Sequence, residues 1–101
     1  GVMGGPMQAQ GHLQMINRLV AYGQNPQAAS DAPRWQILED FSVGLEPGFS
    51  KSVATGLGKK GHRIRYLKTY HPFGGAQIIQ KIDSGYVAGS DHRKEGIAAG
   101  F

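Results

Sequence analysis

The sequence predicts an α+β fold in which short antiparallel strands accompany two main helices. Apolar residues recur at helical spacing in the first quarter of the chain, as expected for an amphipathic helix. Further on, two stretches that favour strands, 76–82 and 86–90, flank the turn Asp83-Ser84-Gly85, which is typical of a β-hairpin. The length of 101 residues fits a single domain covering 1–101, and the 16 glycines indicate many turns and close backbone contacts.

The first elements are a short strand and the main helix. Residues 1–6 are interpreted as the end of a strand that runs into a Gly-Gly-Pro turn. The helix is expected from Met7 to about Tyr22, with Gly23 as its C-terminal cap. Gly11 lies inside this helix, where glycine is unfavourable, so another group must pack closely against it. The apolar stripe of the helix consists of Leu13, Ile16, Leu19, Val20 and Tyr22.

A second, short helix and two strands follow. Asn25-Pro26 is a typical N-cap followed by proline at the first helical position, which predicts a helix through about Ser30. Pro33 ends this helix because the residue before a proline disfavours helical geometry. Short strands are then predicted over 35–38 and 41–45.

The remaining elements are one helix and three strands. Ser50 is a candidate N-cap for a helix over 51–60, in which Val53 and Leu57 lie one turn apart and which Gly61 would end. Alternation of apolar and polar residues, or a run of strand-favouring residues, predicts strands over 63–68, 76–82 and 86–90.

Composition limits the classes of function. Eleven Lys and Arg residues against seven Asp and Glu give a formal net charge of +4, which is mild, and no nucleic-acid partner is expected. The absence of cysteine excludes a disulfide, a Cys-based zinc site and a cysteine nucleophile within this chain. No apolar run reaches the ~18–20 residues of a membrane helix, so no membrane partner is expected. Because the chain opens without an initiator methionine, we expect it to be an excised part of a longer protein.

The pair Gly4-Gly5 is the first candidate for chemistry. It leads directly into a helix, where two backbone N–H groups can point together at an anion because no Cβ blocks the approach. The same arrangement forms an oxyanion hole in acyl transfer. The local pattern alone favours a simpler interpretation, a tight turn that reverses the chain.

Three other groups of residues have simpler explanations. A basic stretch could bind phosphates, but Arg63 and Arg65 share one face of a strand, which favours a solvated face; the stretch contains Lys59, Lys60, His62, Arg63, Arg65, Lys68 and His71, with Tyr66 and Tyr70 nearby. The histidines show no metal-ligand spacing, and no metal is expected; they are His12, His62, His71 and His92. Ser90, Asp91 and His92 are adjacent in the chain and therefore cannot adopt the geometry of a catalytic triad.

Several stretches together resemble the C-terminal part of the small subunit of γ-glutamyltransferases. Each is weak alone, but their order and spacing across nearly the whole chain make the match specific. They are Gly4-Gly5, Leu13-Gln14-Met15, Ala21-Tyr22-Gly23, Asn25-Pro26-Gln27-Ala28-Ala29, Asp31-Ala32-Pro33-Arg34-Trp35, Lys60-Gly61-His62, Gly75-Ala76-Gln77-Ile78-Ile79, Gly89-Ser90-Asp91-His92-Arg93 and Ala98-Ala99-Gly100-Phe101. The variant Gly-Gly-Pro-Met-Gln is more similar to a bacterial acylase-like branch than to the best-known glutathione-cleaving members, which have Pro-Gly-Gly-Ser.

The resemblance implies an N-terminal nucleophile hydrolase with a four-layer αββα sandwich, of which this chain would form part of the sheets and one helical layer. In that family the precursor cleaves itself and exposes an N-terminal threonine. This threonine attacks a γ-glutamyl amide, and water or an amine resolves the acyl-enzyme. The family's oxyanion-hole glycines map onto Gly4 and Gly5. The nucleophile would lie upstream, since Thr55 and Thr69 are internal, and no cofactor is implied.

The resemblance also implies partners, namely the rest of the small subunit, the large subunit and the γ-glutamyl substrate of the parent enzyme. We expect the isolated chain to be inactive and to self-associate through apolar surface that the parent covers. Met3, Pro6 and His92 depart from the family's usual Pro, Ser and Pro. Two alternatives therefore stay open: a same-family acylase for glutaryl or other N-acyl substrates, and a free-standing interaction or nucleic-acid-binding module. The sequence does not indicate the compartment, for which the acylase-like bacterial resemblance leaves the bacterial cytoplasm and the periplasm.

Overall fold

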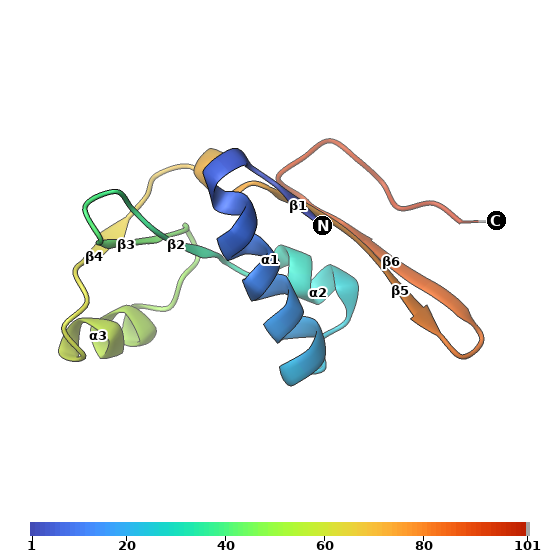
Figure 1. Cartoon of the computed structure of the whole chain (residues 1–101), viewed down its shortest axis with the longest axis horizontal. Helices are drawn as coiled ribbons and strands as arrows, with labels where there is room; N and C mark the ends of the chain where they lie inside the picture. Colours follow the sequence, from blue (N-terminus) through green and yellow to red (C-terminus); the bar gives the residue numbers. More distant parts are fainter. Residues whose placement is uncertain (101) are drawn as a thin grey trace.

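The computed structural model describes residues 1–100 and shows an elongated molecule with two small sheets toward opposite ends (Figure 1). Phe101, the last residue of the motif at 98–101, lies outside the described residues. No helix in residues 1–100 is long and apolar enough to span a membrane. The elements are β1 (Val2–Met3), the 3-10 turn η1 (Gly5–Met7), α1 (Gln8–Ile16), the π-helical turn η2 (Asn17–Ala21), α2 (Pro26–Asp31), β2 (Trp35–Ile37), β3 (Val43–Leu45), α3 (Lys51–Lys59), β4 (Ile64–Tyr66), the 3-10 turn η3 (His71–Phe73), β5 (Gly75–Ile82) and β6 (Gly85–Ser90).

The strands form two three-stranded sheets, and the α+β prediction is confirmed. The first sheet has the order β1–β5–β6, with antiparallel pairing throughout. The second has the order β2–β3–β4, in which β2 and β3 are antiparallel but β3 and β4 are parallel. The parallel pair, which the sequence pattern did not indicate, follows from the connection. Because α3 lies between β3 and β4, it returns the chain to the end of the sheet where β3 began.

Local signals placed the helix ends well, with one exception. The side chain of Asn25 accepts a 2.8 Å hydrogen bond from the Ala28 N–H and caps α2 as predicted. Gly23 follows the π-helical turn with φ +61°, a conformation that favours glycine at a helix end. The exception concerns the bond and not the position: Ser50 is the N-cap residue of α3 as predicted, but its hydroxyl lies 2.7 Å from that of Ser52 and makes no bond to the helix backbone.

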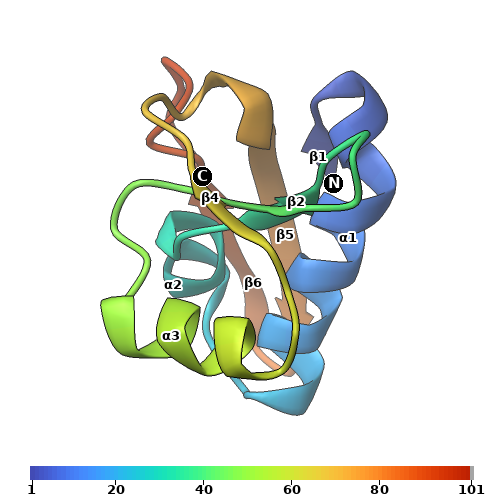
Figure 2. The same cartoon turned by 90° about the vertical axis from the view of Figure 1, so that its left-hand side faces the viewer.

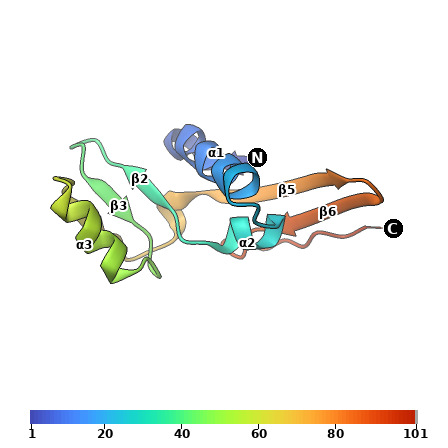
Figure 3. The ribbon, with the colours of Figure 1, turned by 90° about the horizontal axis from the view of Figure 1, so that it is seen from below.

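A first hydrophobic cluster joins α1 and α2 to the sheet β1–β5–β6 (Figure 3). Its buried members are Val2, Met15, Ala29, Ala76 and Ile78, with Leu19 packed against them. Gly11 faces Val2 so closely that a Cβ on residue 11 would lie 2.8 Å from Cγ1 of Val2. The close neighbour predicted for this glycine is therefore the strand that precedes the helix.

The apolar stripe of α1 and η2 is mostly exposed. Its members Leu13, Ile16, Val20 and Tyr22 are 53–77% accessible, whereas the buried residues of the helix are Gly11, Gln14 and Met15. Helix α1 contacts the sheet at Gly11, because only glycine permits so short a distance between the helix and Val2 of β1. This contact turns the apolar stripe toward solvent.

Two glutamines of α1 fix the helix against β2. The Gln14 side-chain amide accepts from the Trp35 N–H at 3.1 Å and donates to the Trp35 carbonyl at 2.8 Å. Gln10 forms the same pair with Ile37, at 2.7 Å and 3.4 Å. The spacing of Gln10 and Gln14, about one turn of α1, thus equals the spacing of Trp35 and Ile37 along the edge of β2. These bonds to the backbone of β2 join the two halves of the molecule.

A second hydrophobic cluster lies between α3 and the sheet β2–β3–β4, at the end of the molecule that Figure 2 faces. Val43, Leu45 and Ala54 are buried, and Trp35, Phe49, Leu57 and Ile64 pack against them. Val53 is exposed, so the inward face of α3 is carried by Ala54 and Leu57. The radius of gyration is 14.5 Å, against about 13 Å for a compact domain of this length. The assignment of 1–101 to one domain stays a prediction.

Candidate functional site

A glycine turn, Gly4–Pro6, connects the end of β1 to α1. Gly4 has φ +150° and Gly5 has φ +55°, and both values favour glycine. Pro6 suits the first turn of a helix because its missing N–H is not needed there. The Met7 N–H donates to the Gly4 carbonyl at 3.1 Å, and the Met7 side chain is buried, so the turn has a fixed shape.

The turn rests on a second glycine pair from the other end of the chain. β1 pairs with β5 so that Met3 lies opposite Gly75. A Cβ on Gly4 would lie 2.9 Å from the Gly74 Cα, and a Cβ on Gly74 would collide with the Met3 carbonyl oxygen. Gly74 itself has φ +70°. The position of the glycine turn therefore depends on the backbone at 74–75.

The N–H groups of Gly4 and Gly5 have no hydrogen-bond acceptor among residues 1–100. A Cβ on Gly5 would meet no atom of the described residues within 4 Å. Both N–H groups are thus available to an acceptor from outside the described residues, and an oxyanion hole would need both to point at the same oxygen.

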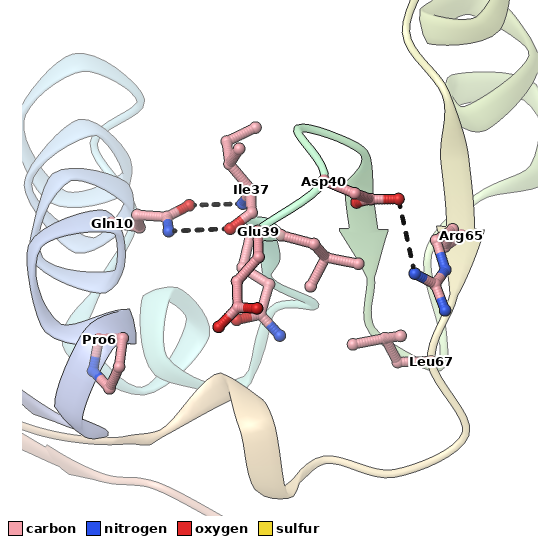
Figure 4. A pocket seen from close by; sticks show the side chains of 9 residues that line it. Pro6, Gln10, Ile37, Glu39, Asp40, Arg65 and Leu67 are labelled. Atoms are coloured by element: carbon pink, nitrogen blue, oxygen red, sulfur yellow. Dashed lines mark hydrogen bonds and ion pairs between the residues drawn. The ribbon is translucent and has the colours of Figure 1, made fainter.

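Two adjoining cavities lie beside the turn. One, of about 350 Å³, is lined by Gly4, Gly74, His71 and Lys94 among others. The other, of about 550 Å³, shares Pro6 and Gln36 with the first. Figure 4 shows it between the turn and helix α1 on one side and Asp40, Arg65 and Leu67 on the other. The two cavities together form a groove, and the glycine turn lies at its border.

A buried ion network, formed by Arg34, Glu46, Asp91 and Arg93, supports the backbone beneath the turn. Arg34 donates to Asp91 at 2.5 Å and to the Phe73 carbonyl at 2.9 Å. Asp91 also accepts from the Ala76 N–H at 2.6 Å. These bonds hold both sides of the Gly74-Gly75 pair.

The same network joins the two halves of the molecule. Arg93 binds Glu46 through two hydrogen bonds, at 2.5 Å and 2.6 Å, and Asp91 at 3.0 Å. Glu46, which follows β3, also accepts from the Arg34 N–H at 2.7 Å. Two positive and two negative side chains, all nearly inaccessible, are thus mutually paired.

The pKa of Asp91 reflects this environment. Burial on its own raises the pKa, but N–H donors from Ala76 and Arg93 and the Arg34 guanidinium outweigh it and lower the pKa from 3.8 to about 2. A depressed native pKa means that the carboxylate stabilises the fold above pH 4 and that this contribution disappears as the pH falls through about 2.

We therefore expect the free energy of unfolding to fall by on the order of 2 kcal/mol between pH 4 and pH 2 through this group. Urea unfolding at pH 7, 4, 3 and 2 measures the decline, and a carboxyl NMR titration of Asp91 assigns it. A titration midpoint near pH 4 for Asp91 would contradict the expectation.

Two of the histidines considered from the sequence, His12 and His92, have structural partners. The His12 ring accepts from the Val2 N–H at 3.2 Å and lies 2.6 Å from the Gln8 carbonyl, so it holds β1 to α1. His92 pairs with Asp31 at 3.1 Å, and the adjacent Ser90, Asp91 and His92 form no triad. No group of three or more possible metal ligands occurs in residues 1–100.

The basic stretch is partly neutralised. Arg63 and Arg65 both lie within 3.9 Å of the Asp40 carboxylate at the tip of the β2–β3 hairpin. A hydrogen bond from the Ser42 hydroxyl, with smaller effects of both arginines, lowers the pKa of Asp40. This arrangement agrees with the solvated face that the strand pattern favoured.

Sequence reasoning missed the ion network and the contact between the two glycine pairs. The motifs at 31–35 and 89–93 both contain members of the network, but nothing in either motif indicates that Arg34 meets Asp91 across 57 residues of chain. The available signals were Arg34, which stands between Pro33 and Trp35, and Glu46, which stands between Leu45 and Pro47, because each is a charged residue between apolar neighbours.

A family model described as gamma-glutamyltranspeptidase matches residues 1–101. The chain is 41% identical over 81 residues to glutathione hydrolase proenzyme 2 of Schizosaccharomyces pombe, covering 79% of this chain and 13% of that protein. It is 31% identical over 108 residues to a glutathione hydrolase-like proenzyme of Bacillus subtilis, covering 100% of this chain and 21% of that protein. The chain thus spans between 13% and 21% of the curated relatives that it matches.

Two solved structures have a fold similar to that of this chain. Cephalosporin acylase from Bacillus halodurans superposes with a TM-score of 0.91 at 42% identity, over 98% of this chain and 19% of that one. A gamma-glutamyltranspeptidase from Pseudomonas nitroreducens superposes with a TM-score of 0.84 at 20% identity, over 100% of this chain and 53% of that one. The second likeness shows a shared fold alone.

Proposed function

Since this chain belongs to the gamma-glutamyltranspeptidase family, we propose that it is the C-terminal part of the small subunit of an enzyme that cleaves γ-glutamyl amides and transfers the γ-glutamyl group. A threonine from an upstream part of the small subunit attacks the amide carbonyl and forms an acyl-enzyme as the amine leaves. Water or a second amine then attacks the acyl ester and releases the threonine. The remainder of the small subunit and the large subunit are the partners of this chain.

In this proposal Gly4 and Gly5 form the oxyanion hole. Their N–H groups donate to the carbonyl oxygen as it becomes negatively charged, and each such donor contributes roughly 10²–10³ to the rate. The observation that carries the proposal is the glycine turn itself, with two N–H groups that lack acceptors among residues 1–100 beside open space at Gly5.

A second candidate is an amide acylase of the same family, acting on glutaryl or other N-acyl substrates. The 42% identity and TM-score of 0.91 to cephalosporin acylase from Bacillus halodurans favour it. The sequence Gly-Gly-Pro at the turn agrees with this candidate, because Pro6 supplies no hydroxyl beside the reacting group.

The full-length parent enzyme separates the two candidates. Release of p-nitroaniline is measured from γ-glutamyl and glutaryl anilides of equal chain length, which differ only in the α-amino group. A higher kcat/KM for the γ-glutamyl compound supports the transferase, and a higher value for the glutaryl compound supports the acylase. Inactivity on both would reject the proposed function.

The isolated 101-residue chain is expected to release no p-nitroaniline from either anilide. An oxyanion hole without a nucleophile gives only weak catalysis, and the proposal places the nucleophile outside this chain. The measurement is the same release assay at micromolar protein, with the parent enzyme as positive control. Release that scales with the concentration of the isolated chain would contradict this assignment of the nucleophile.

We also propose that the isolated chain self-associates. The exposed face of α1 and η2 carries Leu13, Ile16 and Val20, and such contiguous apolar surface usually marks an interface. Sedimentation velocity between about 5 and 200 μM is expected to show a rising weight-average mass. The double variant L13Q/V20Q, which leaves the buried side of α1 untouched, is expected to shift association to higher concentration. A strict monomer at all concentrations would contradict the proposal.

A further inference from the structure

Phe41 combines two unfavourable features at the tip of the β2–β3 hairpin. The residue is 85% accessible, and neither hydrophobic cluster of the described residues includes it. Its backbone has φ +60°, and it is the only residue other than glycine with a positive φ in residues 1–100. The fold of this chain thus gains little from phenylalanine here, whereas glycine or asparagine would fit the left-handed backbone with less strain.

The tip that presents Phe41 is held in a fixed shape. The Phe41 N–H donates to the Leu38 carbonyl, and the Leu38 N–H donates to the Ser42 carbonyl, both at 2.9 Å. The Asp40 carboxylate accepts from the Ser42 N–H at 3.1 Å and from its hydroxyl at 2.5 Å. Arg65 lies 3.8 Å from the same carboxylate (Figure 4). These bonds impose the strained conformation on residue 41 and hold its ring outward before any contact is made.

The ring lies outside the groove beside the glycine turn. Leu38, Glu39 and Asp40 line the larger cavity, but Phe41 is among the lining residues of neither cavity. Figure 3 shows the loop between β2 and β3 at the edge of the molecule. The tip therefore borders the groove with residues 38–40 and presents residue 41 to a neighbour outside it.

Such a neighbour is available in a longer protein. This chain spans between 13% and 21% of the curated relatives that it matches, so most of their length has no counterpart in residues 1–101. Aromatic side chains are the usual anchors of protein interfaces, where they fill well-packed pockets. A ring that is already held outward loses little conformational freedom when it binds.

We propose that Phe41 is an interface anchor whose ring fills an apolar pocket on the part of the parent enzyme outside this chain. Because residues 38–40 line the groove, the same contact fixes the hairpin wall of the groove. This inference goes beyond the proposed function, since it requires the parent protein but none of its activity.

Hydroxyl-radical footprinting tests the contact without any substitution. Trypsin cleaves after Arg34 and Lys51, so one peptide carries both Phe41 and the internal control Phe49, which packs against the second hydrophobic cluster. We expect Phe41 to be oxidised faster than Phe49 in the isolated chain, but at least about fivefold more slowly in the parent than in the isolated chain. Rapid oxidation of Phe41 in the native parent would overturn the inference.

Substitution separates an interface role from a role in the fold of this chain. F41N removes the ring, and asparagine accepts a left-handed backbone better than phenylalanine does. The melting temperature of the isolated chain is therefore expected to stay the same or rise, whereas that of the parent falls by several degrees. F41L keeps an apolar side chain and the strain, and is expected to retain most of the parent's stability. A loss of equal size in both F41N proteins, or none in the parent, rejects the interface.

Two other occupants of the ring have their own signatures. Protection of Phe41 that appears in the isolated chain only at high concentration would assign the ring to a contact between two copies of this chain. Protection that appears in the parent only after a γ-glutamyl or glutaryl anilide is added would assign it to substrate binding. Either result contradicts the proposal, whether or not the parent cleaves the anilide.

Discussion

Replacing Asp91 with asparagine is expected to lower the free energy of unfolding by about 3–5 kcal/mol, the usual result of breaking a buried ion pair on one side. The carboxylate binds Arg34 and Arg93 and accepts from the Ala76 N–H. Its removal leaves two guanidinium groups in a nearly inaccessible place with one carboxylate, Glu46, between them. The loss is a large fraction of the 5–15 kcal/mol that holds a typical domain together.

Urea unfolding of the wild-type chain and the variant, at one protein concentration, measures this difference. The matched control is D31N, which breaks the half-exposed pair with His92 and is expected to change stability by less than about 1 kcal/mol. If D91N and D31N have the same effect, the ion network does not stabilise the fold as described.

Replacing Gly5 with valine in the parent enzyme is expected to lower kcat/KM by roughly 10²-fold or more, the scale for losing one oxyanion donor. A side chain at this position enters open space beside two N–H groups, where the proposal places the reacting carbonyl. The positive φ of Gly5 adds a backbone cost of about 1–3 kcal/mol, which acts on stability and not on chemistry.

Gly23 offers a control that matches Gly5 in both respects. Its φ is +61° against +55° for Gly5, and a Cβ on either glycine meets nothing within 4 Å. G5V and G23V are therefore expected to melt at similarly reduced temperatures, while only G5V loses turnover per folded molecule. Normal turnover of folded G5V would return Gly4-Gly5 to the simpler interpretation of a turn without a chemical role.

The sequence could predict those features whose causes are local. Asn25 caps α2 with an atom three residues away, and the two-residue turn of the β5–β6 hairpin is defined by its own residues. Gly11 indicated a close neighbour because glycine inside a helix is otherwise costly. In each case the signal and the structure lie within a few residues of one another, or the cost of the residue itself demands an explanation.

What the sequence did not predict depends on distant partners. The parallel pairing of β3 with β4 needs the path of α3, and the outward stripe of α1 needs the contact between Gly11 and Val2. The glycine turn was found by resemblance, but its support was not. The contact of Gly4 with Gly74 and the bond of Arg34 to Asp91 join residues that are 57 or more positions apart. No single motif contains both members of such a pair.

The paired amides of Gln10 and Gln14 set the position of α1 in discrete steps. Four residues of helix rise about 6 Å, and two residues of strand rise about 6.6 Å, so both amides meet the edge of β2 in one alignment. A slide of the helix by one residue would misplace both at once, and no intermediate position keeps either pair. Because α1 starts at the glycine turn, this alignment also sets how far the turn lies from the hairpin β2–β3. The two glutamine pairs therefore fix the width of the groove between the turn and the hairpin. Small changes in core packing cannot alter this width gradually, because any shift of α1 along β2 would break both pairs.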